Sequence, residues 1–229
     1  MSQVRININA FIKAVDKNYS SNFINEGEIY LNTISWFREY EKQDSNIGDS
    51  FENVELACAR GMSMHIKPVD KDVPFTKVTD DLQNFKVYKN NVKACLFCLY
   101  SVLERDSLSL ENGIYENNIE PDFIKEYSDR EFFIITNPSN FLDRTIQELQ
   151  KHENVVSFEY GMVNYYPFNE EPKRTTSFDK RDKYIYQKEF RFFITLKKDE
   201  PLLLRLGDLN DIAKNFKPKD HHKIFYNLG

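Results

Sequence analysis

The sequence is poor in glycine, with 7 in 229 residues, and it contains neither a GxGxxG nor a GxxxxGK[ST] segment. Such segments let backbone N–H groups approach a phosphate closely in dinucleotide-binding and P-loop proteins. Their absence argues against these two classes of nucleotide-binding protein. The chain also lacks a linker rich in proline, glycine and serine, so we expect one domain over residues 1–229.

Cysteine is equally scarce. The three cysteines are Cys58, Cys95 and Cys98, and an odd number cannot form a fully paired disulfide framework. Cys95 and Cys98 lie in the apolar run of residues 92–100, where a strand would point them to opposite faces. No other metal ligands have suitable spacing, so we expect buried free thiols and no bound metal.

Long hydrophobic runs are missing too. The start of the chain has no apolar run of signal-peptide length, and no apolar segment of about 18 residues occurs elsewhere. We therefore expect a cytoplasmic protein without a membrane partner. The formal charge of -5 gives no support for nucleic-acid binding through bulk charge. A local basic patch remains open, formed by Lys173, Arg174, Lys180, Arg181 and Lys183.

Aromatic residues, in contrast, are abundant, with 19 Phe and 13 Tyr to fill a core. Strand patterns outnumber helix patterns and do not alternate regularly with them, which favours an α+β domain with a mixed or antiparallel sheet and peripheral helices. The periodicities predict strands at 4–8, 28–33, 57–67, 85–88, 92–100, 131–136, 155–166, 185–196 and 202–206, a polar loop at 169–183, and helices at 18–26, 35–43, 121–127, 138–152 and 207–213.

The most informative segment runs from Tyr184 to Ile194. As a strand it would place Gln187, Glu189 and Arg191 on one polar face inside a segment too hydrophobic for an exposed loop. A carboxylate and a guanidinium two positions apart either form a structural ion pair or bind a ligand. The pattern leaves both interpretations open.

Several landmarks resemble a widespread family of bacterial and phage proteins of uncharacterised function. The family's "gxlylsxxxxFNDPfE"-like segment is matched by residues 26–33, Trp36-Phe37-Arg38 and Gly48-Asp49-Ser50-Phe51-Glu52. Its aromatic "K…ExEwR" strand is matched by residues 183–191, and its Gly-Asp-Leu turn by residues 207–209. The chain departs from the pattern where Asn-Asp-Pro becomes Gly-Asp-Ser. The resemblance suggests a role in phage–host conflict.

The layout also resembles the ADP-ribosyltransferase fold, which carries Arg or His on its first strand, a hydroxyl on its second and a Glu, often in QxE, on a late one. The resemblance implies catalytic residues Glu189 and Gln187, and NAD-binding residues Arg5, Thr33, Ser35 and Arg191. It implies NAD as the substrate. Arg5 would bind the phosphates, and a hydroxyl would orient the carboxylate or the nicotinamide ribose. Glu189 would stabilise an oxocarbenium-like transition state, and Gln187 would position the acceptor.

Two other function classes remain open. The first is a non-catalytic protein that binds a protein partner in immunity or toxin control, through exposed Tyr165, Tyr166 and Phe168. The second is a divalent-metal nuclease built from Asp49, Glu52 and Glu189. A nucleotide or a protein is thus the expected partner, and homo-oligomerisation is undecided by the sequence.

Overall fold

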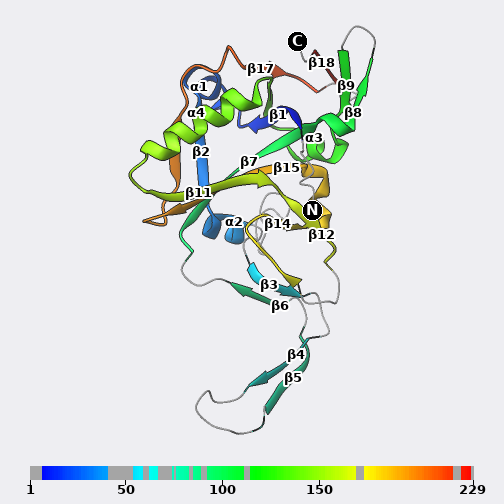
Figure 1. The fold of residues 1–229 in the computed structure, drawn as a ribbon, viewed down its shortest axis with the longest axis vertical. Coiled ribbons are helices and arrows are strands. Elements are labelled where there is room, and N and C mark those ends of the chain that lie inside the picture. Colours follow the sequence, from blue (N-terminus) through cyan, green and yellow to red (C-terminus); the bar gives the residue numbers. More distant parts are fainter. Residues whose placement is uncertain are drawn as a thin grey trace. The chain divides into compact units, whose positions relative to one another are not determined.

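The structure is a computed structural model. It describes residues 7–40, 54–58, 62–66, 74, 76–82, 85–88, 92–110, 114–168, 173–218 and 223–227. Backbone contacts group the chain into two compact units, each drawn in Figure 1. Unit 1 comprises Met1–Thr33, Lys93–Met162 and Tyr186–Gly229, and unit 2 comprises Ile34–Val92 and Val163–Ile185. The prediction of one domain over residues 1–229 stays a prediction.

Unit 1 is built on an antiparallel sheet with the strand order β11-β15-β7-β1-β10-β17, in which β2 also pairs with β7, and β16 with β2. The bounds are β1 Ile8–Val15, β2 Glu28–Thr33, β7 Ala94–Leu103, β10 Glu131–Ile135, β11 Val155–Met162, β15 Glu189–Leu196, β16 Leu202–Arg205 and β17 Ala213–Phe216. The α+β class and the antiparallel sheet are thus confirmed. β7 lies between β15 and β1, so the apolar run of residues 92–100 forms the expected central strand.

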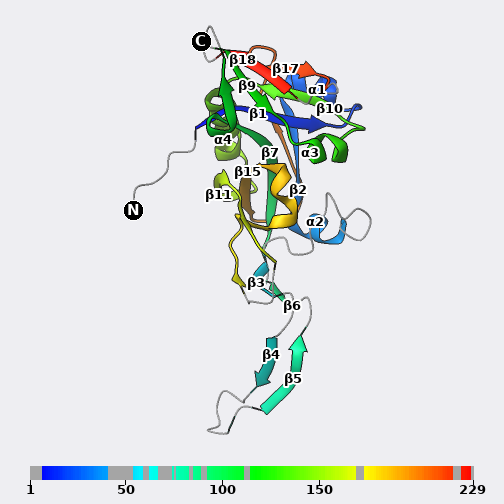
Figure 2. The ribbon, with the colours of Figure 1, turned by 90° about the vertical axis from the view of Figure 1, so that its right-hand side faces the viewer.

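The two faces of this sheet carry different clusters of buried side chains. One face holds Phe11, Phe97 and Phe192 and is covered by α4 (Pro138–Lys151) through Phe141 and Leu149. The other face is covered by α3 (Pro121–Glu126), whose apolar residues pack with Ile12 and Tyr100. Figure 2 shows α4 and α3 on opposite sides of the sheet. Charged groups that enter this sheet therefore leave water for an apolar environment.

The remaining elements of unit 1 are short. Helix α1 (Ser20–Glu26) buries Phe23 and ends at Gly27, whose φ of 61° is left-handed. A second antiparallel sheet has the order β18-β9-β8, with bounds β8 Ser107–Ser109, β9 Ile114–Asn118 and β18 Lys223–Asn227, and it follows the 3-10 turn η1 at Glu104–Asp106. The predicted helix at 207–213 is wrong, because Gly207 takes a φ of 79° and the chain turns directly into β17.

Unit 2 contains helix α2 (Ile34–Tyr40), a three-stranded sheet β13-β3-β6, a parallel pair β12-β14 and a hairpin β4-β5. The bounds are β3 Val54–Cys58, β4 Met62–Ile66, β5 Thr76–Leu82, β6 Phe85–Tyr88, β12 Asn164–Tyr166, β13 Lys173–Arg174 and β14 Asp179–Arg181. The described part of the predicted loop at 169–183 therefore contains two strands and the start of η3, a 3-10 turn at Asp182–Gln187.

Candidate functional site

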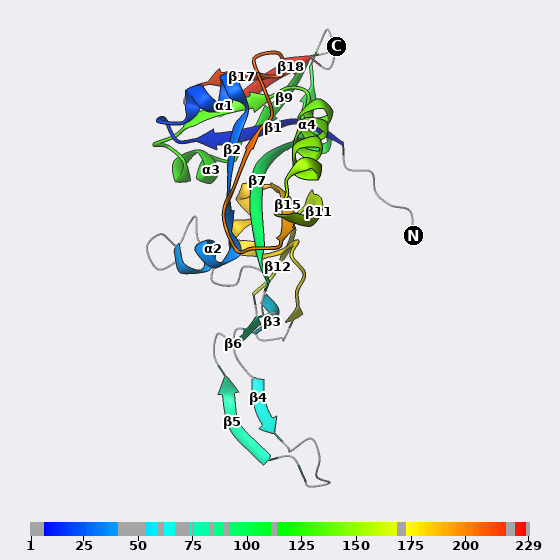
Figure 3. The same ribbon diagram turned by 90° about the vertical axis from the view of Figure 1, so that its left-hand side faces the viewer.

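Two strands, β1 and β2, pair with different parts of the same edge of the central strand β7 and leave a gap between them, which we call the fork. On one edge β7 pairs with β15 from Ala94 to Tyr100. On the other edge β1 reaches Tyr100 from one end, and β2 reaches Leu96 from the other. Among the described residues, no strand is registered with residues 97–99 on that edge. Figure 3 shows β1 and β2 taking different directions beside β7.

Lys13 of β1 fills this fork. Its Nζ donates a hydrogen bond to the carbonyl oxygen of Cys98 at 2.9 Å and lies 4.4 Å from the centroid of the Phe97 ring. The amine therefore supplies a donor to a carbonyl on the open edge of β7. Burial lowers the pKa of Lys13 to about 8, with a further lowering by Arg130, while Cys98 and Glu189 act in the opposite direction. A lysine with such a pKa exchanges its proton close to neutral pH.

Glu189 and Arg191 form a buried ion pair at the start of β15. The Nε of Arg191 lies 2.6 Å from Oε1 of Glu189, and the two residues are 0 % and 3 % exposed, respectively. Glu189 is opposite Tyr100 and Arg191 is opposite Cys98, so both belong to the sheet face covered by α3. A pair with so little solvent contact is costly to desolvate and strongly dependent on both partners.

The Glu189 carboxylate affects the Lys13 amine, although the two residues come from opposite faces of the sheet. Lys13 starts from the face of Phe11, whereas Glu189 lies on the opposite face, yet the carboxylate still raises the pKa of the amine. Glu189 and Arg191 belong to β15, on the edge of β7 opposite the fork, and the electrostatic effect of Glu189 connects this ion pair with Lys13. We call Lys13, Glu189 and Arg191 the fork cluster.

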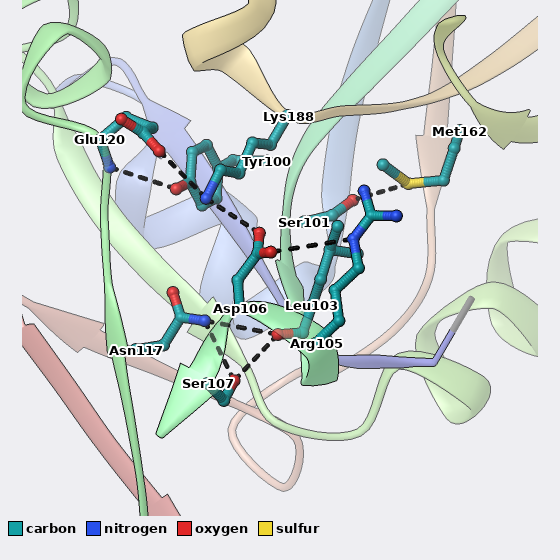
Figure 4. Close-up of polar contacts among 10 residues, drawn as sticks. All are labelled: Tyr100, Ser101, Leu103, Arg105, Asp106, Ser107, Asn117, Glu120, Met162 and Lys188. Atoms are coloured by element: carbon teal, nitrogen blue, oxygen red, sulfur yellow. Dashed lines mark hydrogen bonds and ion pairs between the residues drawn. The ribbon is translucent and has the colours of Figure 1, made fainter.

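The chain enters β15 through a constrained junction. Gln187 is 6 % exposed, and its Nε2 donates to the Glu126 carboxylate oxygens at 3.1 and 3.3 Å. Lys188 has a φ of 37°, the left-handed region that residues with a Cβ rarely adopt. Its Nζ lies 3.0 Å from Oδ2 of Asp106 and 3.0 Å from Oε1 of Glu120 (Figure 4). Such strain persists only where surrounding contacts hold it, and it is frequent at functional sites.

Tyr100 links this junction to the sheet. Its hydroxyl accepts a hydrogen bond from the backbone N–H of Glu120 at 3.2 Å (Figure 4). Burial raises the pKa of Tyr100, and Lys188 offsets part of that effect. Burial on its own would lower the pKa of Lys188, but Tyr100, Asp106 and Glu120 raise it, and the net shift is upward. Lys188 is therefore an anchoring cation rather than a proton donor near neutral pH.

The structure brings together only part of the predicted site. Glu189 and Arg191 share a face as expected, but Gln187 belongs to η3 rather than to the strand, because the backbone turns at Lys188. Thr33 is buried opposite Cys95, on the face of Leu31. Since Glu189 is opposite Tyr100, five positions further along β7 and on the other face, Thr33 is about 17 Å away along the strand.

The other predicted site residues lie in unit 2 or outside the described residues. Ser35 is exposed on α2 in unit 2. Arg5, Asp49 and Glu52 lie outside the described residues. Within the described ranges, no three His, Cys, Asp or Glu side chains gather where they could hold a metal ion.

Lys13 is the site residue that sequence reasoning missed. It follows Phe11 and Ile12 and precedes Ala14 and Val15, so it is a single charge in an apolar strand. That isolation is the available signal, since an unpaired lysine is rarely buried. The sequence pattern predicts the first strand at 4–8, whereas β1 begins at Ile8, so the expected first-strand cation Arg5 precedes β1 in the chain and Lys13 is the lysine within it.

The exposed aromatic surface expected for a protein-binding function is not found at the predicted residues. Tyr166 is 3 % exposed, and Tyr165 and Phe168 are only partly exposed. The prediction that these rings form an exposed cluster is wrong, because Tyr166 belongs to β12, which pairs with β14.

Comparison with protein-family models gave no match, and neither did comparison with curated proteins or with solved structures. None of the helices within the described ranges has the length and apolar character needed to cross a membrane. The fork cluster is therefore the feature from which a function can be inferred.

Proposed function

We propose that the protein is a cytoplasmic enzyme that acts on NAD or a related nucleotide, by ADP-ribosyl transfer or by hydrolysis of the glycosidic bond. The observation that supports this proposal is the fork cluster, in which a buried carboxylate forms an ion pair with Arg191 and raises the pKa of the Lys13 amine, which binds the Cys98 carbonyl in the fork. Charged groups in an apolar interior cost folding free energy, so the burial of this ion pair beside β7 favours a functional role. The resemblance to phage and bacterial proteins supports a role for this activity in phage–host conflict.

Each member of the fork cluster has a role in the proposed reaction. Lys13 binds the phosphates of the nucleotide, in place of the Arg5 expected from the sequence. Glu189 accepts a hydrogen bond from a ribose hydroxyl and stabilises the positive charge that develops at ribose C1′. Arg191 is a positioning residue, because its Nε fixes the orientation of the Glu189 carboxylate at 2.6 Å.

The bond changes are those of a glycosidic substitution. The bond between the nicotinamide nitrogen and ribose C1′ breaks, and its electron pair leaves with nicotinamide. Water or an acceptor nucleophile forms the new bond at C1′ and releases a proton. Lys13 keeps its own proton while it binds the phosphates, so the released proton passes to water.

The proposed reaction requires that the substrate reach Glu189. Glu189 is 3 % exposed, so a substrate reaches it only after the covering side chains move. Tyr186 packs against the cluster of side chains on this face and is adjacent to the strained junction at Lys188. We therefore expect the segment from Tyr186 to Lys188 to rearrange when substrate binds.

The test is incubation of the full chain with NAD, with nicotinamide release measured by chromatography and label transfer measured with a tagged NAD. We expect turnover by the parent and a loss of roughly 100- to 1,000-fold in Glu189→Gln, because a transition-state interaction is removed. Glu159→Gln, which changes an exposed carboxylate on the neighbouring strand β11, is the matched control and should retain activity. No turnover by the folded parent, with or without a cell extract as acceptor source, would contradict the proposal.

Non-catalytic binding of a protein partner is the second candidate function. An exposed apolar pair favours it: Tyr30 on β2 is 59 % exposed and lies directly opposite Leu203 on β16, which is 41 % exposed. Tyr30→Ser should then shift the assembly state seen by light scattering, whereas Val156→Ser on β11, also exposed at 60 %, should not. Equal behaviour of both variants and the parent would remove this candidate.

A further inference from the structure

The sheet β18-β9-β8 of unit 1 has one buried face and one exposed face. Along each strand, successive side chains point to opposite faces. Ile224 of β18 is registered with Asn117 of β9, and the two are 7 % and 1 % exposed. Ile224 belongs to the cluster of side chains that α3 covers, so these two residues mark the inward face. The neighbouring positions on each strand form the outward face.

The outward face carries apolar side chains. Leu108 of β8 and Phe225 of β18 are 61 % and 59 % exposed, and both are registered with Glu116 of β9, one on each side. Leu110 and Ile114 are 37 % and 39 % exposed, and the N–H of Leu110 donates a hydrogen bond to the carbonyl of Ile114 at 2.7 Å. We call Leu108, Leu110, Ile114 and Phe225 the outer patch.

Glu116, which lies between Leu108 and Phe225, forms an ion pair on the same face. Its Oε1 lies 2.5 Å from the Nζ of Lys223, which is two positions from Phe225 on β18. The Glu116 side chain is 14 % exposed, whereas that of Lys223 is 41 % exposed. The two charges cancel, and the lysine stays accessible from outside. The outer patch therefore surrounds a pair with no net charge.

This distribution of side chains differs from that of most sheets with one buried face. The exposed face of an antiparallel sheet is usually polar. Single exposed apolar residues are common on protein surfaces, but apolar side chains that gather in one patch mark interaction sites. The outer patch extends over three neighbouring strands, which lie about 5 Å apart. It therefore has the character of a surface that another molecule covers.

We propose that a second copy of this chain covers the outer patch, so that the outward faces of two β18-β9-β8 sheets pack against each other in a homodimer. In a two-fold contact the same surface supplies both sides, so the apolar side chains of both copies leave water together. A two-fold axis along β9 places Phe225 of one copy over Leu108 of the other, because these residues lie on opposite sides of β9. Sheets that pack face to face lie about 10 Å apart, which accommodates the side chains of both inner faces.

The charges on this face favour a second copy over a partner of one strong charge. A basic or an acidic partner gains little from a face whose two charges cancel. In the two-fold contact the accessible Lys223 of one copy approaches Glu116 of the other, so neither carboxylate is buried without a cation. The formal charge of -5 on each chain opposes association, but salt screens it beyond roughly 10 Å at 0.1 M.

The small size of the outer patch implies a weak dimer. Four apolar side chains on each copy are few compared with the roughly 20–30 residues a side of a standard interface. We therefore expect a dimer whose fraction rises with protein concentration in the micromolar range. Assembly is measured without NAD and without turnover, so this proposal and the proposed function can fail separately.

The first test is sedimentation velocity of the full chain from about 1 µM to about 200 µM. We expect the mass to rise from that of one chain to that of two. Phe225→Ser should raise the concentration needed for half-dimerisation by about tenfold or more, with an unchanged melting temperature, because the ring is exposed in the single chain. Val156→Ser on β11, which removes a side chain that is 60 % exposed outside the patch, should assemble as the parent does.

A parent that stays monomeric at every concentration would overturn the proposal. So would equal weakening of assembly in Phe225→Ser and Val156→Ser. Binding of the monomeric parent, but not of Phe225→Ser, to uncharged phosphatidylcholine vesicles would instead assign the patch to a lipid surface and also overturn the proposal.

The second test exchanges the charges of the ion pair. Glu116→Lys gives each copy two lysines on this face, and Lys223→Glu gives each copy two carboxylates, so each variant alone should be monomeric through repulsion. An equal mixture of the two variants brings opposite charges together across the contact and should restore dimers that contain one copy of each. A mixture as monomeric as its components would show that the two copies do not meet at this face.

Discussion

Lys13 donates a hydrogen bond from its Nζ to the carbonyl oxygen of Cys98 at 2.9 Å, and the two residues are 85 positions apart in the chain. Among the described residues, no neighbouring strand is registered with Cys98 on the edge that β1 and β2 share. The Lys13 side chain supplies the hydrogen-bond donor that a paired strand would otherwise supply to this carbonyl. Burial of the amine disfavours its charged form, and this lowers its pKa to about 8. The fork is therefore stabilised by a group whose charge changes near neutral pH.

This relationship predicts a pH dependence of stability. Below about pH 8 Lys13 is charged in both the folded and the unfolded state, whereas between about 8 and 10.5 only the unfolded state keeps the proton. Because the unfolded state then binds more protons, the Lys13 contribution to the free energy of unfolding rises with pH over this window. The full gain is on the order of 3 kcal/mol, since each pKa unit corresponds to about 1.4 kcal/mol.

The measurement is urea unfolding of the parent and of Lys13→Met at several pH values from 7 to 10. The parent should gain stability relative to Lys13→Met as the pH rises, and comparison of the two cancels the titration of all other groups. Lys17→Met, which removes an exposed lysine from the same region, should show no such change. Parallel curves for the parent and Lys13→Met would contradict the prediction.

For Cys95 we expect the opposite pH dependence, a free energy of unfolding that falls as the pH rises. Burial raises the pKa of its thiol from 9.0 to about 12. Between these values the unfolded state loses a proton that the folded state keeps, so the contribution of Cys95 to stability is lost as the pH rises, up to an order of 4 kcal/mol. Cys95→Ala should therefore unfold less readily than the parent under increasingly alkaline conditions, once the two are matched at pH 8. Cys98→Ala, which alters the half-buried second thiol, is the comparison and should retain the alkaline loss.

Local patterns in the sequence predicted local structure well. The β2 strand and the α4 helix follow from alternation and from helical periodicity. Asn137 caps α4, because its Oδ1 accepts a hydrogen bond from the N–H of Asn140 at 3.0 Å. The buried strand at β7 follows from an apolar run with no competing signal. These features depend on neighbours within a few positions, which a single sequence contains.

The candidate site could be predicted only in part, since it depends on pairings between distant segments. The sequence placed Glu189 and Arg191 on one face, because two positions on a strand determine that. It could not show that β1 and β2 share one edge of β7 and leave residues 97–99 for Lys13. It also could not show the left-handed backbone at Lys188, since ion pairs with Asp106 and Glu120, distant in sequence, hold that conformation.

Because Glu189 and Arg191 form a buried ion pair, we expect the effects of mutating them on the free energy of unfolding to be strongly non-additive. Glu189→Leu leaves the Arg191 charge buried without its carboxylate, so we expect a loss of about 3–5 kcal/mol in the free energy of unfolding. The double variant Glu189→Leu/Arg191→Met removes both charges and should recover most of that loss. Denaturant unfolding of the parent, both single variants and the double variant gives the coupling free energy. Additive losses would show that the two side chains do not depend on each other.

Gly27 and Gly207 provide a final prediction, because both are left-handed but only one is crowded. Gly27 has a φ of 61°, and a Cβ there would collide with the carbonyl oxygen of Gly207. Gly207 has a φ of 79°, and a Cβ there would meet nothing within 4 Å. The backbone around both positions is also joined, since Leu206 donates its N–H to the Gly27 carbonyl at 3.0 Å. Gly207→Ala should therefore cost only the conformational strain, about 1–2 kcal/mol, whereas Gly27→Ala should cost more, because the end of α1 and the turn before β17 must separate. Thermal and denaturant unfolding of the two variants measure this difference, and equal losses would show that the contact at Gly27 relaxes without cost.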